Sequence, residues 1–455
     1  VGFDGSTGEW SEAAVLEFAP PPPHPGIFGV VEGFYGRPWT WTQRLEALRF
    51  MAALGMNAYV YAPKDDPFHR KEWTAPYPAT EMRWFTKLLE TGQAVGVEVV
   101  YAISPGLTIR PYIQRDFDRL TAKLEPFVTA GCRSFALCLD DIKVKTDGRS
   151  GRAHAALTAK LKKWLDERDS KLMMVGTVYF ATPWTKAAER VEYLKELGWM
   201  PAEVPIMWTG EGVFDAVMDP THAKGVGKNF IRRKPLVWDN YPVNDYYYRS
   251  RRLFLGPVTG RDAKLLEEIS GLLVNPMTHQ VASRPAMLSY GVLFASPEEY
   301  EPRFVANDLM LALEAEGDPS PYELLVSDYS VSPKLHPRTP AQPELEGEVA
   351  VFLKASRRKD RELVTAAAER FTAVLAQRYE SDAKVLAGAR NPSLADELWP
   401  VLHKRKAQLE LALAVVGVLA SPGDAGAAAA LEKLWKLYVP HPLGWRWYAY
   451  DDALD

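Results

Sequence analysis

The feature that most constrains the fold of this chain is a regular alternation of short strand-like runs with longer helical segments. From residue 26 onward, β-branched and aromatic runs recur at intervals of about 30 to 40 residues, with amphipathic stretches between them. Such an interval accommodates the crossover helix that neighbouring parallel strands require. The candidate strands cover residues 27–33, 57–63, 98–104, 133–141, 171–179, 203–208, 235–240 and 272–276.

Eight strand–helix units over about 250 residues are typical of a (β/α)8 TIM barrel. The spacing alone also allows an open, doubly wound sheet, but the count of eight favours the barrel. Polar or aromatic residues at the strand ends support it, because the carboxyl ends of all barrel strands meet on one face. These strand-end residues are Glu32, Gly33, Lys64, Asp65, Asp66, Asp140, Asp141, Tyr179, Trp208, Trp238, Asp239, Asn240 and Asn275.

The segments on either side of this alternation have a different character. Residues 1–25 end in PPPHP, which favours a leader or linker because proline cannot continue a helix or a central strand. After about residue 280 the strand pattern gives way to helical periodicity. The sequence therefore predicts a leader at 1–25, a catalytic (β/α)8 barrel at 26–280 and an α-helical bundle domain at 281–455.

Composition excludes several classes of function. A net charge of −4 gives no basic excess for nucleic acid or an acidic membrane surface. We expect no membrane span, since no apolar run reaches about 18 residues. Cys132 and Cys138 lie in or beside one apolar run and are expected in the core, and the histidines lack the spacing of a zinc site. We therefore expect no metal and no organic cofactor.

The cellular compartment stays open. The first residues do not resemble a secretory signal, but the sequence begins at Val1, so a trimmed start is an alternative. We expect a soluble protein, with the cytoplasm favoured and secretion as the alternative if a signal was removed.

Asp140 and Asp141 follow an apolar run at the end of a predicted strand. Consecutive strand residues point to opposite faces, so both carboxyl groups reach one site only where the strand ends and the backbone turns. Because two such close carboxyl groups cannot both ionise cheaply, we expect one to hold a proton near neutral pH and the pair to supply general acid and base chemistry. The alternatives are a helix cap, a metal site or the end of a Walker B strand, which would need a phosphate loop that the sequence lacks.

Other strand ends suit a sugar ligand. Trp238, Asn240 and Asp245 lie within WDNYPVND, which combines an aromatic wall with donors and acceptors for hydroxyl groups. Gly33 would let the backbone approach a ligand closely. Lys64 could equally be a surface lysine paired with its neighbouring aspartates, and Trp238, Tyr179 and Asn275 could be structural.

Seven blocks follow one another over about residues 26–280: GVVEGFYGRPW at 29–39, YAPKDDPFHR at 61–70, YAISPGL at 101–107, GCRSFALCLDDI at 131–142, WDNYPVND at 238–245, RLFLGP at 252–257 and NP at 275–276. In this order they resemble the family 84 glycoside hydrolases, which are the O-GlcNAcases and related bacterial β-N-acetylglucosaminidases. The chain resembles the shorter bacterial members, which lack the acetyltransferase-like domain of the animal enzymes.

The resemblance implies a substrate-assisted reaction in which the 2-acetamido oxygen of the sugar attacks its own anomeric carbon and forms an oxazoline. Asp140 would orient and polarise the acetamido N–H. Asp141 would protonate the leaving oxygen and then deprotonate water, giving retention without an enzyme nucleophile, an exception to the usual two-carboxylate scheme.

The resemblance also implies contacts to the sugar. Gly33, Lys64 and Asn275 would contact hydroxyl groups, and Asp245 would bind the O4/O6 side. Asn240, Trp238 and Tyr179 would surround the acetamido group. Two further residues, Trp184 and Tyr246, would line the side of the leaving group.

These expectations add up to a retaining exo-β-N-acetylglucosaminidase that removes O-GlcNAc from serine and threonine of proteins or peptides. The alternatives are a hexosaminidase acting on free glycans or glycosaminoglycan ends, a non-catalytic glycan-binding barrel, and a metal- or nucleotide-dependent barrel enzyme. The expected partner is a GlcNAc-bearing glycopeptide or glycan, with neither nucleic acid nor membrane. The helical domain could support a homodimer.

Overall fold

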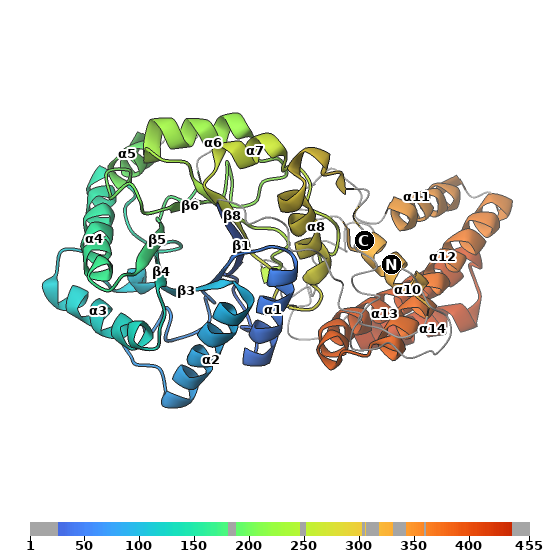
Figure 1. Cartoon of the computed structure of the whole chain (residues 1–455). Coiled ribbons are helices and arrows are strands. Elements are labelled where there is room, and N and C mark those ends of the chain that lie inside the picture. The colour runs from blue at the N-terminus through green and yellow to red at the C-terminus, as the bar shows by residue number, and fades with distance from the viewer. Residues whose placement is uncertain are drawn as a thin grey trace.

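A computed structural model describes residues 26–180, 188–245, 252–302, 305, 318–330, 343–358 and 361–438. Eight parallel strands form a closed barrel in the order β1 to β8, and β1 pairs with both β2 and β8 (Figure 1). The predicted TIM barrel is therefore confirmed over the open sheet. The strands are β1 (Ile27–Glu32), β2 (Ala58–Tyr61), β3 (Glu98–Ile103), β4 (Ser134–Cys138), β5 (Lys171–Val175), β6 (Ile206–Trp208), β7 (Leu236–Asp239) and β8 (Gly271–Val274).

Helices surround the barrel and cover its outer face (Figure 1). The first of them begins with a capping box, in which the Thr40 hydroxyl accepts the Gln43 N–H and the Gln43 side chain accepts the Thr40 N–H. The helices are α1 (Trp41–Ala53), α2 (Ala79–Val95), α3 (Gln114–Thr129), α4 (Gly148–Asp166), α5 (Ala188–Leu197), α6 (Pro220–Val226), α7 (Ala263–Glu268) and α8 (Arg284–Ala295), with short helical turns at Pro105–Leu107, Gly227–Ile231 and Pro297–Glu299.

Side-chain alternation along the strands produces two apolar cores. One lies inside the barrel and includes Val60, Ala136 and Leu273, while the larger one lies between the strands and the helices. Both cysteines are buried and free, as expected of core residues. Neighbouring residues of a strand enter different cores. The same alternation therefore determines whether the side chain at the end of a strand faces the barrel axis or the surrounding helices.

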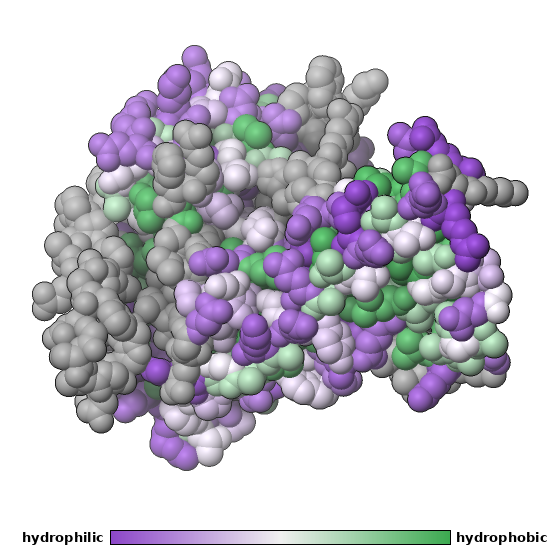
Figure 2. Space-filling model, turned by 90° about the vertical axis from the view of Figure 1, so that its right-hand side faces the viewer, coloured by the Kyte–Doolittle hydropathy of each residue, from purple (hydrophilic) through white to green (hydrophobic). Residues whose placement is uncertain are grey.

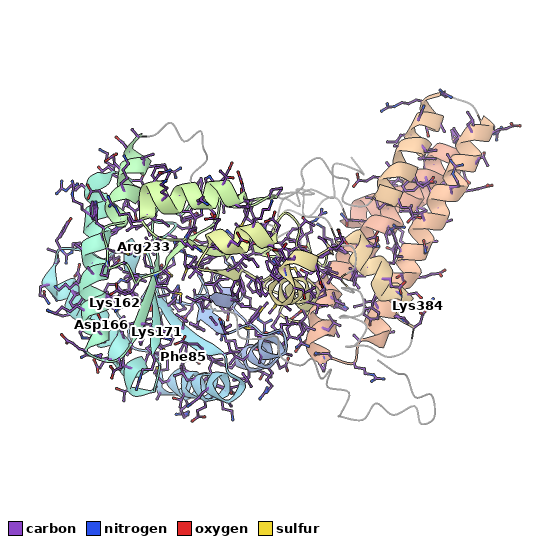
Figure 3. All side chains as sticks on the ribbon, turned by 45° about the horizontal axis from the view of Figure 1, so that its top comes forward. Phe85, Lys162, Asp166, Lys171, Arg233 and Lys384 are labelled. Atoms are coloured by element: carbon purple, nitrogen blue, oxygen red, sulfur yellow. The ribbon has the colours of Figure 1, made fainter. Side chains whose placement is uncertain are left out.

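One arginine holds the segment between α5 and β6. The guanidinium of Arg233, labelled in Figure 3, donates to the carbonyl groups of Gly198, Met200, Pro201 and Val204. These contacts satisfy backbone acceptors beyond the end of α5 and fasten the segment that leads into β6.

A helical region follows the barrel and lies beside it (Figure 1), which agrees with the helices predicted there. Its own apolar core includes Phe352, Phe371, Leu375 and Leu409, and the buried Asp328 pairs with arginines of two of its helices. The helices are α10 (Ser320–Asp328), α11 (Pro343–Arg358), α12 (Arg361–Gly388), α13 (Pro392–Ala420) and α14 (Ala425–Tyr438).

Helix α8 belongs structurally with the barrel. Phe294 of α8 packs against Phe28 of β1, with ring centroids 4.4 Å apart, and the Tyr290 hydroxyl donates to Asp239 of β7. The division of the chain near residue 280 stays a prediction, and the leader at 1–25 lies outside the described residues.

The outer face of the helical region, shown in Figure 2, mixes hydrophilic side chains with scattered apolar ones. Val351, Leu363 and Trp399 are among the exposed apolar residues of helices α11, α12 and α13. Scattered exposure of this kind is ordinary for a folded surface, so the homodimer stays a prediction. Within the described residues, no helix combines the length and the hydrophobicity needed to cross a bilayer.

Glu397 connects the helical region to the barrel. This α13 carboxylate accepts hydrogen bonds from the backbone N–H groups of Val281 at 3.2 Å and Ala282 at 2.9 Å, and from Gln43 of α1 at 3.1 Å. Burial raises the pKa of Glu397 to about 7, against the opposing effect of the N–H donors.

The raised pKa of Glu397 predicts a pH-dependent stability. The folded state holds the Glu397 proton more tightly than the unfolded chain does. The resulting contribution to the free energy of unfolding is therefore complete below the ordinary glutamate pKa and is lost as the pH rises through about 7. We expect the free energy of unfolding to fall between pH 5 and pH 7.5 by roughly 1–3 kcal/mol more in the wild type than in Glu397→Gln. Thermal or urea unfolding at both pH values measures this difference. The exposed control Glu369→Gln should keep the wild-type slope, and an equal slope in Glu397→Gln would contradict the prediction.

Candidate active site

A cavity of about 660 Å³ opens at the carboxyl ends of the barrel strands. The nine residues expected to be catalytic or to contact the hydroxyl and acetamido groups of the sugar all line it, and they come from the ends of six strands or the loops that follow them, at β1, β2, β4, β5, β7 and β8. Residues far apart in the chain thus share one pocket, as the barrel geometry requires. The nine residues are Gly33, Lys64, Asp140, Asp141, Tyr179, Trp238, Asn240, Asp245 and Asn275.

Asp140 is buried and forms an ion pair with the buried ammonium of Lys64 through its Oδ2 atom. Its other oxygen, Oδ1, is also buried and has no hydrogen-bond partner among the described residues. Desolvation and the negative charge of Asp140 act in opposite directions on Lys64, and the pKa of Lys64 is raised. The surface-lysine alternative is therefore wrong, and Asp140, which lines the cavity, keeps one acceptor unsatisfied in the described structure.

Asp141 stands just beyond the strand in the left-handed backbone region, with φ of 51°. This turn brings two consecutive carboxyl groups to one pocket although strand geometry would separate them. Its Oδ1 accepts the Tyr179 hydroxyl at 2.7 Å, and its Oδ2 accepts the Tyr35 hydroxyl at 2.9 Å. Burial raises the pKa of both tyrosines, so each phenol stays a neutral donor.

The electrostatic surroundings of Asp141 favour its ionised form in this structure. Burial raises its pKa, but the charge of Lys64, the hydrogen bonds from Tyr179 and Tyr35 and the charge of Arg70 outweigh burial and lower it. The expectation that one acid of the pair holds a proton is thus not supported for Asp141 as it stands here.

Helix capping does not explain the aspartate pair. Helix α4 begins at Gly148, and its cap is Asp147, whose carboxylate accepts the Ser150 N–H at 3.0 Å. In the part of the chain that the structure describes, no group of three or more His, Cys, Asp or Glu side chains is arranged to hold a metal ion.

An aromatic and amide wall closes one side of the pocket. The indole N–H of Trp238 donates to the Asn240 Oδ1 at 3.0 Å, and the same oxygen accepts the Asn275 amide at 2.9 Å. The Asn240 amide donates to the carbonyl of Val213 at 2.8 Å, and Asn275 accepts the Gly33 N–H at 3.2 Å. These bonds fix both amide groups before any ligand binds, which is the geometry that precise recognition needs.

Two carboxylates hold the loop that follows β1. The Tyr35 N–H donates to Asp245 at 2.9 Å, and the Gly36 N–H donates to Asp65 at 2.8 Å. Asp245 therefore lines the cavity as expected, and it also braces the loop that carries Tyr35.

Some strand-end residues turn away from the cavity. Glu32 pairs with Arg44 behind β1, Asp239 pairs with Arg261, and Trp208 is buried in the outer core. Asp66 accepts the hydroxyls of two tyrosines and is also structural. Alternation along the strands explains these positions, because Asp239 must face outward where Trp238 faces inward.

Sequence reasoning missed part of the cavity lining. Tyr35 lies two residues beyond Gly33 in the block GVVEGFYGRPW, so its position near a strand end is a signal that the sequence contains. Thr209, Val213 and Phe214 follow β6 without any chemical pattern. Trp184 and Tyr246, expected near the leaving group, lie outside the described residues.

The fold and the cavity together define a (β/α)8-barrel protein with a carboxylate-bearing pocket at the usual functional face. Residues 28–321 match the family model described as beta-N-acetylglucosaminidase. The chain therefore belongs to this family, glycoside hydrolase family 84, as the resemblance predicted.

Curated relatives and solved structures agree. The chain is 36% identical over 259 residues to the protein named Protein O-GlcNAcase in Rattus norvegicus and in Mus musculus, covering 55% of this chain and 28% of each relative's length. It thus spans little more than a quarter of those proteins. The structure called CpGH84B superposes with a TM-score of 0.75 at 28% identity, covering 90% of this chain and 73% of that one. The structure of a mutant O-GlcNAc hydrolase of Thermobaculum terrenum superposes with a TM-score of 0.75 at 25% identity, covering 90% of this chain and 87% of that one.

Gly33 is required because of its neighbour across the barrel. A β-carbon added there would lie 2.1 Å from Cζ2 of the Trp238 ring, and the ring is already fixed by Asn240. We expect Gly33→Ala to displace Trp238 and to weaken binding of a GlcNAc-derived inhibitor about tenfold or more, since overpacking costs roughly 1–3 kcal/mol. Calorimetric titration measures the affinity. Gly347→Ala in α11, where an added β-carbon meets nothing within 4 Å, is the matched control, and unchanged binding in Gly33→Ala would count against this account.

Proposed function

We propose that this chain is a retaining exo-β-N-acetylglucosaminidase that uses substrate-assisted catalysis. The observation that carries the proposal is the state of Asp140. Asp140 lines the cavity; one of its oxygens is fixed by Lys64, and the other is buried without a hydrogen-bond partner among the described residues. A buried acceptor of this kind is costly unless a ligand supplies a donor, and the acetamido N–H of N-acetylglucosamine is a fitting donor.

In this proposal, Asp140 accepts the acetamido N–H and turns the amide oxygen toward the anomeric carbon. Negative charge on Asp140 polarises the amide, and the amide oxygen attacks to form the oxazoline as the glycosidic bond breaks. The neutral phenol of Tyr179, which lies beside Asp141, is a donor for the acetamido oxygen or the oxazoline. The sugar carries its own nucleophile, so the chemistry needs neither an enzyme nucleophile nor a metal.

Asp141 takes the acid and base part of the reaction. It must hold a proton to protonate the leaving oxygen, whereas its surroundings here lower its pKa. A bound sugar would exclude water from this carboxyl group, which is exposed in the structure, and would draw Tyr179 toward the acetamido group. Both changes raise the pKa of Asp141, so binding itself would prepare the acid.

The proposed natural substrate is O-GlcNAc on serine or threonine of proteins or peptides. The relatives named Protein O-GlcNAcase and the O-GlcNAc hydrolase among the structural neighbours support this choice. Free glycans and glycosaminoglycan ends remain the alternative substrates, because recognition of the sugar itself would be the same.

The two aspartates should respond differently to substitution. We expect Asp140→Asn to lower kcat by about 10²–10⁴-fold on every aryl N-acetylglucosaminide, because anchimeric assistance is lost. Asp141→Asn should lower kcat by a similar factor on poor leaving groups and much less on good ones, because acid assistance then matters less. Steady-state kinetics over a leaving-group series measures both effects.

Asp118→Asn, on the exposed face of α3, serves as the control and should match the wild type. Full activity in both site variants would refute the assignment. Binding of a GlcNAc ligand by the wild type without any turnover would favour the non-catalytic glycan-binding barrel instead.

A competition between two substrates tests which natural leaving group the enzyme prefers. We expect a GlcNAc-modified serine peptide to be hydrolysed with a higher kcat/KM than chitobiose at equal concentration, as followed by mass spectrometry. A clear preference for chitobiose would replace the protein substrate by free glycans and would leave the mechanism untouched.

A further inference from the structure

The backbone at Asp141 needs external support. Its φ of 51° lies in the left-handed region, which is disfavoured for residues that carry a side chain, although aspartate tolerates it better than most. Such a conformation persists only where neighbouring groups hold it. The turn is also what brings Asp141 beside Asp140, so whatever holds it controls the geometry of the pair.

Arg70, in the loop after β2, contacts this turn directly. Its side chain is buried, and one guanidinium nitrogen donates to the backbone carbonyl of Asp141 at 3.0 Å. The other terminal nitrogen donates to the Tyr35 hydroxyl at 2.8 Å, and the guanidinium lies 5.4 Å from the centre of the Tyr35 ring. The same hydroxyl donates to Oδ2 of Asp141 at 2.9 Å.

We propose that Arg70 is a positioning residue for the acid–base carboxyl group: it holds the left-handed turn at Asp141 with one nitrogen and aims the Tyr35 hydroxyl at the Asp141 side chain with the other. The proposal rests on the function proposed above. Arg70 itself does not line the cavity, so it acts through Tyr35 and Asp141 rather than on the sugar.

The residue type matters because two acceptors must be reached at once in a fixed plane. A guanidinium presents its donors as a rigid fork, whereas a lysine ammonium is a point charge on a flexible stem. Arg70→Lys therefore keeps the charge and loses the geometry, while Arg70→Met loses both. This difference separates positioning from simple electrostatics.

The groups that face Asp141 come from several loops. Lys64 and Arg70 come from the loop after β2, Tyr35 from the loop after β1, and Tyr179 from the segment after β5, with Asp140 adjacent in the chain. Arg70 is one of the groups that lower the pKa of Asp141. Removing its charge should raise that pKa, and a variant that retains a charge should show a smaller rise.

The test compares Arg70→Met, Arg70→Lys and Tyr35→Phe with the wild type on aryl N-acetylglucosaminides that carry good and poor leaving groups. For both Arg70 variants we expect kcat on the poor leaving group to fall about 100-fold, the cost of a misplaced catalytic group, with a smaller fall on the good one and little change in KM. The alkaline limb of the pH profile should move upward in Arg70→Met and in Tyr35→Phe, and should move less in Arg70→Lys than in Arg70→Met, because the lysine keeps the charge although it no longer aims the Tyr35 hydroxyl. The surface variant Arg152→Met on α4 is the control.

Equal losses on both substrates with an unmoved alkaline limb in Arg70→Met would overturn the inference, as would wild-type kinetics in that variant. If Arg70→Met does not fold, Tyr35→Phe carries the same test, since it removes only the hydroxyl that Arg70 aims. A wild type that hydrolyses no N-acetylglucosaminide would sink the proposed function, and the positioning role is then measured without turnover. Carbon-13 NMR titration, assigned with Asp141→Asn, should give a higher pKa for Asp141 in Arg70→Met, and an unchanged pKa would overturn the role.

Discussion

The buried ion pair between Lys64 and Asp140 is the interaction on which the candidate site depends. Both groups are removed from water, and each would be costly to bury alone. The pair consumes one carboxylate oxygen and leaves the other without a partner in the described structure. A charge is thereby kept in place beside the cavity, with one carboxylate oxygen left to accept a further hydrogen bond. In the proposed function, this restriction is what selects an amide N–H as the partner of Asp140.

The loop after β1 is held in place by residues from several strand ends of the barrel. Its Trp39 N–H is accepted by Glu32 at 3.1 Å, and Glu32 is held in turn by Arg44 of α1. In the same loop, Asp245 accepts the backbone N–H of Tyr35 and Asp65 accepts the backbone N–H of Gly36. Residues from three different strand ends therefore fix the position of one short segment, and that segment places Tyr35 beside Asp141.

Most of the fold could be predicted because the strand–helix unit of the barrel recurs along the sequence. Each strand appears as a short β-branched or aromatic run, and each helix appears as an amphipathic stretch. The lining of the cavity could be predicted where a strand ends in chemically distinctive residues such as Asp140 or Trp238. It could not be predicted where the direction of a side chain decides its role. Glu32 and Asp239 looked like Asp140 in sequence, yet each faces outward to an arginine, Arg44 and Arg261 respectively, because of its parity along the strand. Tyr35 was missed because its role depends on a contact made across the barrel to Asp141.

The same arrangement accounts for an apparent contradiction in the electrostatics. A general acid should be protonated, but the donors around Asp141 stabilise its anion. Tyr179 serves both states, since its hydroxyl contacts Asp141 here and is also the group proposed to reach the acetamido oxygen. If binding transfers this donor from the carboxylate to the substrate, Asp141 loses a stabilising hydrogen bond when it needs a proton. The acid would then be generated only in the presence of the correct sugar, which links recognition of the N-acetyl group to proton transfer.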